Sequence, residues 1–373
     1  MATHFFHSGM VGAPTNTNAA GSTLAIIRAV LSTGFNLLTP QSANVASGVM
    51  TLTYSAPHGY EDKVLIRLDG AAGGSIVNRV TATAGSSSLT IPAPGFADGP
   101  VAGSLSTRVA PADWEEVFTD TGVGVFRSKV IGPGSTRFYY RVADTVSGSG
   151  VRTIRGFESM TDANTGTGPF PTTTQEAGNG VLTYRMDSAT PMDWVAVVDG
   201  RTCYVGMGIS VTNAMISFCF GDFVPFGNTD SFAAMVAGGT SSWTSSYPLS
   251  YHGAAWYSPR NAAGSSSPLS FVRLTPFGLT VSNSPGSGTM QTYPSPIDGG
   301  MVFVKNILAN EGLNDSPLRG VVRGLMFCSA NPLVSARWMI INSVPGINGR
   351  VVVFRDGGNV PGCVAFPIDE DWS

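Results

Sequence analysis

The feature that most constrains the fold is an alternation of apolar and polar residues with a period of two, which begins near residue 48. It is clear in 49-VMTLTY-54 and 63-KVLIRL-68, and the text between such segments is rich in Gly, Pro, Ser and Asp. A period of two places alternate side chains on opposite faces of a β-strand, and separators of this composition form turns. We therefore expect a mainly β protein. Further strands are predicted at 76–83, 87–91, 123–130, 136–144, 151–157, 180–186, 194–200, 202–209, 215–223, 270–275, 301–307, 338–344 and 350–356.

One segment has helical periodicity instead. In 22-STLAIIRAVLSTGF-35 the apolar residues recur at intervals of three and four, the Ser-Thr pair can cap the start, and Gly34 can end the helix. A helix this short must dock on a sheet to be stable.

The chain divides into three predicted parts. Residues 1–20 are expected to form an N-terminal arm, with Phe5 and Phe6 as candidate contacts to a neighbouring subunit. Residues 21–109 are expected to form a small β-barrel or sandwich with the one short helix, and the Pro/Gly-rich stretch 92–103 reads as its exit. Residues 110–373 are expected to form a larger β-sandwich-like unit with long loops, and its division into one domain or two stays open.

The composition limits the possible partners. Charged residues make up only 12% of the chain, against about 25% in an average protein, which suits a surface that packs against copies of itself. The net charge is −3 and no basic cluster occurs, so nucleic-acid binding is not expected. No apolar run is long enough to span a membrane, and the N-terminus does not resemble a signal peptide. The chain is therefore expected to be made and assembled in the cytoplasm.

Arginine supplies most of the positive charge, because lysine occurs only at positions 63, 129 and 305. Codon bias is one explanation for the preference for arginine over lysine. A role for Arg in partly buried contacts is the other. The four cysteines do not have the spacing of a metal site, and we interpret them as buried free thiols. They are Cys203, Cys219, Cys328 and Cys363.

No catalytic motif is recognisable, so neither an enzyme, a cofactor nor a metal is expected. Only four histidines are available, and none has an orienting acid close by in a convincing pattern; His4 and His7 have an H-x-x-H spacing without a further ligand. In 54-YSAPHGYEDKVLIRLDG-70 we interpret His58 as part of a turn, with the two following acids in solvent. In 158-ESMTDANTGTGPFP-171 a Ca²⁺ loop is possible, but a turn that bonds its own backbone is favoured.

A long segment, about 238–268, is rich in aromatic residues. Exposed Trp and Tyr stack on sugars and anchor protein interfaces, so this segment is the best candidate for a contact surface. The alternative is an aromatic cluster that fixes the loop to its own domain. The candidate residues are Trp243, Tyr247, Tyr251, Trp256 and Tyr257.

The segment 54-YSAPHGYEDKVLIRLDGAAGGSIVNRVTATAGSSSLTI-91 has a recognisable order: an aromatic strand, His-Gly with a bulky residue, a spacer, a strand ending in Gly, an Asn-containing turn and two Thr-containing strands. This order resembles a small β-domain of tailed-phage proteins. Other stretches also resemble uncharacterised phage virion proteins, namely 92–129, 155-RGFESMTDANTGTGPFP-171, 319-RGVVRGLMFC-328 and 369-DEDW-372.

The resemblance implies a virion structural protein of the tail tip or baseplate type, present as a symmetric homo-oligomer and contacting other tail proteins. Its expected location is the virion, after assembly in the host cytoplasm. Two alternatives stay open: a receptor-binding protein that recognises host surface glycan through the 238–268 loop in host attachment, and a capsid-associated decoration protein. A depolymerase is the least favoured interpretation, because the chain lacks β-helix repeats and an acidic groove.

Overall fold

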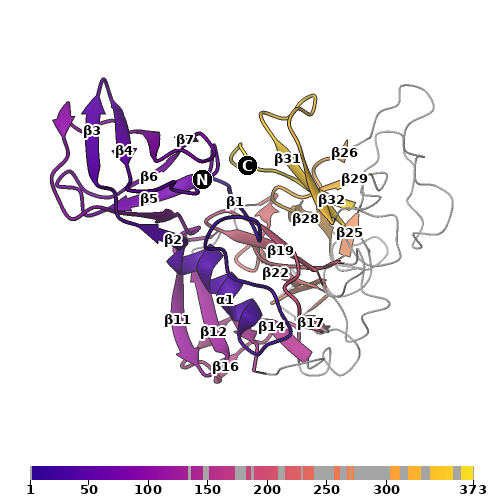
Figure 1. Ribbon diagram of the computed structural model, residues 1–373. Helices are drawn as coiled ribbons and strands as arrows, with labels where there is room; N and C mark the ends of the chain where they lie inside the picture. The colour runs from indigo at the N-terminus through magenta and orange to yellow at the C-terminus, as the bar shows by residue number, and fades with distance from the viewer. Residues whose placement is uncertain are drawn as a thin grey trace.

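The computed structural model describes residues 2–132, 136–145, 151–172, 182–185, 189–208, 215–227, 230–238, 256–260, 267–268, 270–272, 303–310, 318–328, 337–355 and 363–372. Strands make up 48% of the described residues and helix 5%. The strands form several antiparallel sheets (Figure 1). The predicted mainly β fold class is therefore confirmed.

A seven-stranded antiparallel sheet lies at the centre and is buried on both faces. In β18 the side chains of Trp194, Ala196 and Val198 enter one core, whereas Val195 and Val197 enter another. Because β18 is buried on both faces, its sequence is an uninterrupted run of apolar residues. The strands, in spatial order, are β1 (His4–His7), β18 (Trp194–Val198), β19 (Thr202–Gly208), β20 (Met215–Asp222), β22 (Ala234–Ala237), β23 (Trp256–Ser258) and β24 (Ser267–Pro268).

A second sheet and the helix cover one face of this central sheet. The helix α1 (Ser22–Arg28) continues as a π-helical turn, η1 (Ala29–Thr33), and Gly34 with φ 68° ends it. A short hairpin covers the outer face of the second sheet, where Met160 and Ala163 are buried beside Val125. The sheet contains β11 (Trp114–Asp120), β12 (Val123–Ser128), β13 (Tyr139–Ala143), β14 (Val151–Phe157) and β17 (Leu182–Arg185), and the hairpin contains β15 (Ser159–Met160) and β16 (Gly166–Thr167).

Two C-terminal sheets cover the opposite face, where Phe354 and Phe366 pack near Tyr204 of β19. The five-stranded sheet contains β26 (Phe303–Val304), β29 (Met326–Cys328), β32 (Cys363–Pro367), β31 (Val351–Arg355) and β30 (Trp338–Ile341). The four-stranded sheet contains β21 (Val224–Pro225), β28 (Leu318–Val321), β27 (Leu308–Asn310) and β25 (Ser270–Val272).

Two further sheets are formed by residues 35–109, here called the small domain, which lie within the range predicted for a small β-domain with one helix (21–109). Its two sheets enclose Met50, Leu52, Ile66, Leu68 and Ile91. One sheet contains β2 (Phe35–Leu38), β10 (Ser106–Val109), β5 (Leu65–Asp69) and β6 (Ile76–Arg79). The other contains β7 (Thr81–Ala82), β8 (Ser88–Pro92), β4 (Val49–Thr53), β3 (Ser42–Ala46) and β9 (Gly99–Pro100).

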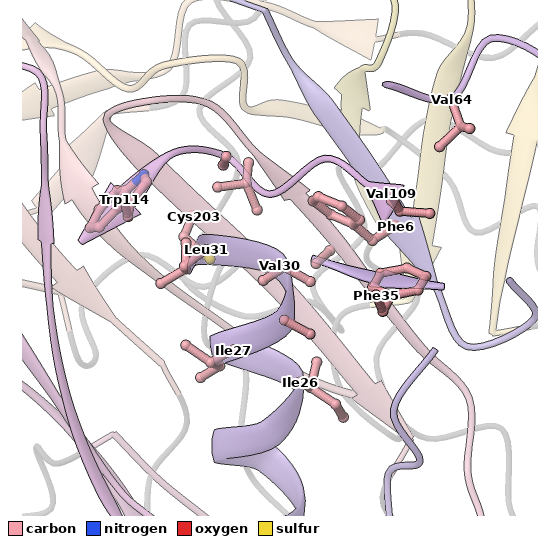
Figure 2. Packing of buried hydrophobic residues seen from close by; sticks show 14 of the residues in the cluster. Phe6, Ile26, Ile27, Val30, Leu31, Phe35, Val64, Val109, Trp114 and Cys203 are labelled. Atoms are coloured by element: carbon pink, nitrogen blue, oxygen red, sulfur yellow. The ribbon is translucent and has the colours of Figure 1, made fainter. Parts of the chain in front are cut away.

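The helix docks outside the small domain to which it was assigned. Helix α1 contacts β12, and η1 contacts β11 and β18. Leu31 lies toward Cys203 and Trp114 in the shared core, as Figure 2 shows. The helix therefore joins the small domain to the rest of one continuous core.

A distant carboxylate caps this helix, in place of the expected Ser-Thr pair. Asp144 Oδ2 accepts hydrogen bonds from the backbone N–H groups of Thr23 at 2.8 Å and Leu24 at 3.3 Å. Its other oxygen accepts a bond from Arg152 Nε at 2.7 Å, and both side chains of this ion pair are fully buried. The carboxylate thus satisfies two helix N–H groups and a buried cation at once.

Residues 2–20 do not form an arm separate from the fold, which corrects the prediction. Strand β1 pairs antiparallel with β18, and Phe6 is 1% exposed in the main core. Phe5 is half-buried and its ring meets Trp338 edge-on. The two phenylalanines predicted as assembly contacts therefore stabilise their own chain.

Phe6→Ala should lower the free energy of unfolding by about 3–5 kcal/mol, because it empties a fully buried aromatic site. Phe5→Ala is the matched control and should cost clearly less, since that ring is only half-buried. Guanidinium unfolding of both purified variants measures the difference. Equal and small losses would show that β1 does not belong to the cooperative core.

Candidate functional site

Two of the five aromatic residues predicted to form a contact surface at 238–268 are buried in the structure. Trp256 and Tyr257 lie in β23, where they are 1% and 8% exposed. They pack in the two cores of the central sheet, so they cannot stack on an external sugar without unfolding that strand. The other three candidates, Trp243, Tyr247 and Tyr251, lie outside the described residues.

The histidines do not assemble a catalytic or metal site in the part of the chain that the structure describes. No group of three or more His, Cys, Asp or Glu side chains there could hold a metal ion. Three of the cysteines, Cys203, Cys219 and Cys363, are buried free thiols, as predicted.

The stretch 158–171, a possible Ca²⁺ loop, forms a turn in which side chains bond the backbone of the turn itself. This is the alternative that the sequence favoured. Asp162 Oδ1 accepts hydrogen bonds from the backbone N–H groups of Asn164 at 2.7 Å and Thr165 at 2.8 Å. The Asn164 amide also bonds Asp120 Oδ2 at 2.7 Å. The bonds from Asn164 and Thr165 lower the pKa of Asp162, and the pKa of Asp120 is lowered first by the backbone N–H of Thr121 and then by the Asn164 amide.

His58 is a structural residue of the turn between β4 and β5. Its Nδ1 accepts a hydrogen bond from the backbone N–H of Tyr60 at 3.0 Å, which confirms the predicted bond to the following loop. Its ring lies between Tyr54 and Tyr60, and Nε2 makes no hydrogen bond of normal geometry. Burial lowers the pKa of His58, and the carbonyl of Ser88 opposes only part of that shift.

The sequence missed a histidine–carboxylate pair between His7 and Glu61. His7 Nε2 lies 3.0 Å from Glu61 Oε2, so Glu61 does not simply face solvent as expected. His7 Nδ1 accepts a hydrogen bond from the Gly9 N–H at 3.1 Å, so it cannot take a proton from a nucleophile. The pair joins β1 to the small domain, and no local sequence signal reveals it because its members are 54 residues apart.

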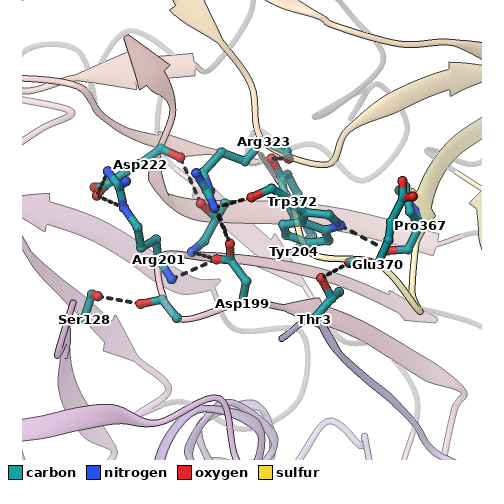
Figure 3. A network of polar contacts seen from close by, with 12 residues as sticks. Thr3, Ser128, Asp199, Arg201, Tyr204, Asp222, Arg323, Pro367, Glu370 and Trp372 are labelled. Atoms are coloured by element: carbon teal, nitrogen blue, oxygen red, sulfur yellow. Dashed lines mark hydrogen bonds and ion pairs between the residues drawn. The ribbon is translucent and has the colours of Figure 1, made fainter. Parts of the chain in front are cut away.

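A buried polar network surrounds the turn between β18 and β19 (Figure 3). Asp199 Oδ1 accepts the backbone N–H groups of Arg201 at 2.8 Å and Thr202 at 2.6 Å. Asp199 Oδ2 accepts Arg323 Nη2 at 2.8 Å, and this same nitrogen donates to the carbonyl oxygen of Trp372 at 2.7 Å. One buried carboxylate therefore fixes a turn of the central sheet, the segment after β28 and the C-terminal segment.

Further hydrogen bonds and an ion pair extend this network. Arg201 makes two hydrogen bonds to Asp222 Oδ2, and Tyr204 donates to the carbonyl of Arg323 at 2.7 Å. Burial raises the pKa of Asp222 to about 6, although the charge of Arg201 opposes the shift. Asp199 itself is fully buried.

Seven large apolar side chains of the described residues are exposed to solvent, and three of these lie in the small domain. Leu37, on the edge strand β2, is 68% exposed, and Val11 is 55% exposed. Val11 packs beside Gly59, and the neighbouring Gly12 lies against Asn36, the residue before Leu37. Val11 and Leu37 therefore flank one corner of the small domain. The others of this kind are Val49, Val77, Ile131, Phe226 and Leu318.

Comparison with known proteins gives no family: no protein-family model matches the chain, and no curated protein matches it significantly. No helix in the described ranges is long and apolar enough to cross a membrane.

Arg323→Met should lower the free energy of unfolding by about 3–5 kcal/mol, because it leaves the Asp199 carboxylate buried without its cation. Lys129→Met is the matched control: Lys129 pairs with Asp113 on the surface, and such pairs contribute only about 0–1 kcal/mol. Chemical unfolding monitored by tryptophan fluorescence measures both. A loss below 1 kcal/mol for Arg323→Met would contradict the role given to the network.

Proposed function

We propose that this protein is a structural component of a tailed-phage virion, most consistent with the tail tip or baseplate, where symmetric copies contact each other and other tail proteins. The sequence resemblance supplies the virion assignment. The rigid multi-sheet build and the low fraction of charged residues, 12%, support a role in assembly rather than in catalysis.

The observation that carries the assembly role is the exposed apolar corner formed by Val11 and Leu37. Apolar side chains that gather on a surface commonly mark contacts with other proteins. The corner lies on the domain that also carries the phage-type sequence pattern, so the resemblance and the surface feature coincide on one part of the chain.

Leu37→Asp should weaken association between copies at least tenfold, because it places a charge at the centre of the proposed contact. Stability should be nearly unchanged, since Leu37 is 68% exposed. Sedimentation velocity over a concentration series measures the association. Ile131→Asp is the matched control, because Ile131 is also exposed, at 55%, but lies outside the small domain. A wild-type protein that stays monomeric at every concentration, or an equal effect of both variants, would argue against this corner as the contact.

Labelling with an antibody to this chain should mark the distal end of the tail on particles of the encoding virus, as seen by electron microscopy. Label on the head would instead support the capsid-decoration alternative. Particles that carry no label and no copy of the chain would rule out a virion component.

The receptor-binding alternative now depends on Trp243, Tyr247 and Tyr251, because Trp256 and Tyr257 are buried. It predicts that Trp243→Ala abolishes adsorption to host cells while particles assemble normally. Trp256→Ala does not test this idea, since loss of a buried ring also destabilises the protein.

A further inference from the structure

The loop between β30 and β31 contains an Asn-Gly pair, Asn348 and Gly349. Asn348 is exposed, and among the asparagines of the described ranges it is the one that a glycine follows. In such a pair the backbone nitrogen of the glycine can attack the amide carbon of the asparagine side chain, because no Cβ hinders its approach. Whether this reaction proceeds in a folded protein depends on how the fold holds the two residues.

The fold leaves the reacting groups of this pair open. Within the described part of the chain, neither the Asn348 side chain nor the Gly349 N–H makes a hydrogen bond. The bond that Asn348 does make uses its backbone N–H, which donates to Glu370 Oε2 at 3.1 Å. An amide that is bonded in a ladder must first give up its acceptor before its nitrogen can attack, and Gly349 has no such cost there.

The chemistry needs only water. The Gly349 nitrogen forms a bond to Asn348 Cγ and closes a five-membered succinimide ring. The C–N bond of the side-chain amide breaks, and the proton of the Gly349 N–H passes through solvent to the amide, which leaves as ammonia. Water then opens the ring. Cleavage of the bond to Cγ gives aspartate, whereas cleavage of the bond to the backbone carbonyl carbon gives isoaspartate, and each product carries a new carboxylate.

The backbone directly after the pair is held against Asp369. The Arg350 N–H donates to Asp369 Oδ2 at 2.9 Å, and the Arg350 guanidinium bonds both carboxylate oxygens at 2.8 Å. A Cβ on Gly349 would lie 2.6 Å from Asp369 Cβ, so the backbone has no spare room on that side. Isoaspartate adds one carbon atom to the main chain before Gly349 and therefore displaces this joint. Aspartate adds only a charge.

We propose that Asn348 is a site of spontaneous deamidation in the folded protein, and that its isoaspartate product loosens the entry of the chain into β31. The site rests on three observations: the exposed asparagine, the glycine that follows it, and the open hydrogen-bonding state of both reacting groups. The modification is independent of the proposed virion role, because it requires no partner.

Peptide mapping by mass spectrometry tests the site on the purified whole chain, sampled during incubation at pH 8.5. Deamidation replaces an NH₂ group by OH, which raises the peptide mass by about 1 Da. Asn342 is the matched internal control, because it is exposed in the same loop but is followed by a serine, whose Cβ hinders the attack. Deamidation at Asn348 should be on the order of tenfold faster than at Asn342.

The same incubation in guanidinium chloride gives the rate that the local sequence alone sets, and so separates the contribution of the fold. The rate at Asn348 in the folded protein should stay within about tenfold of the rate in the unfolded chain, because the fold leaves the reacting groups open. A folded rate more than tenfold below the unfolded rate would overturn the proposal. A folded rate no higher than that at Asn342 would overturn it as well.

Hydrogen exchange tests the structural consequence on the isoaspartate form, which anion-exchange chromatography separates from the incubated protein. Protection of the Val351 and Val352 amides should fall at least about fivefold in this form. N348D is the matched control, because it carries the new charge on a main chain of normal length, and its protection should change less than about twofold. Unchanged protection in the isoaspartate form, or an equal loss in N348D, would contradict the loosening by a longer main chain.

Discussion

The structure depends on the carboxylate of Asp199, which sits where the central sheet turns from β18 to β19. It accepts two backbone N–H groups of its own turn and the guanidinium of Arg323. The same turn supplies two carbonyl acceptors to the second sheet, one to Trp114 Nε1 at 2.9 Å and one to the hydroxyl of Ser128. A buried carboxylate is tolerated only when its hydrogen-bonding capacity is filled. Here the turn itself and Arg323 fill the capacity of the carboxylate, and the carbonyl groups of the same turn bond the second sheet, so this one turn connects three layers.

Hydrogen bonds to backbone carbonyl groups also hold the two ends of the chain together. Thr3 Oγ1 donates to the carbonyl of Glu370 at 2.6 Å, and Arg79 of the small domain donates to the carbonyls of Thr3 and Ile368. The two termini therefore lie close together between the small domain and the C-terminal sheets (Figure 1). Strand β1 contacts all three regions, because it pairs with β18, His7 bonds Glu61 of the small domain, and Phe5 meets Trp338 of the C-terminal sheets.

Sequence reasoning succeeded where local periodicity carries the information. The strands β4, β5, β8, β14, β19 and β31 lie within one or two residues of the predicted segments, because their alternation or apolar runs are strong. It missed β1, β2, β3 and β10, which are four or five residues long and have weak patterns. It also missed the Asp144 cap and the His7–Glu61 pair, since these join residues 121 and 54 positions apart. Contacts between residues this far apart in the chain cannot be recognised from the local pattern of a single sequence.

The scarcity of surface charge has a physical explanation in the fold. Arginines pair with aspartates inside the chain: Arg152 with Asp144, Arg201 with Asp222, and Arg323 with Asp199. Arg319 pairs with Asp230 and Arg350 with Asp369 in the same way. Arginine suits these positions because its planar fork bonds several acceptors at once, so the preference for Arg over Lys has a structural reason besides codon bias. These five pairs place ten of the 45 charged residues of the chain between the layers. Charge held inside the fold is absent from the outer surface, and a surface of low charge costs less to desolvate when another protein covers it.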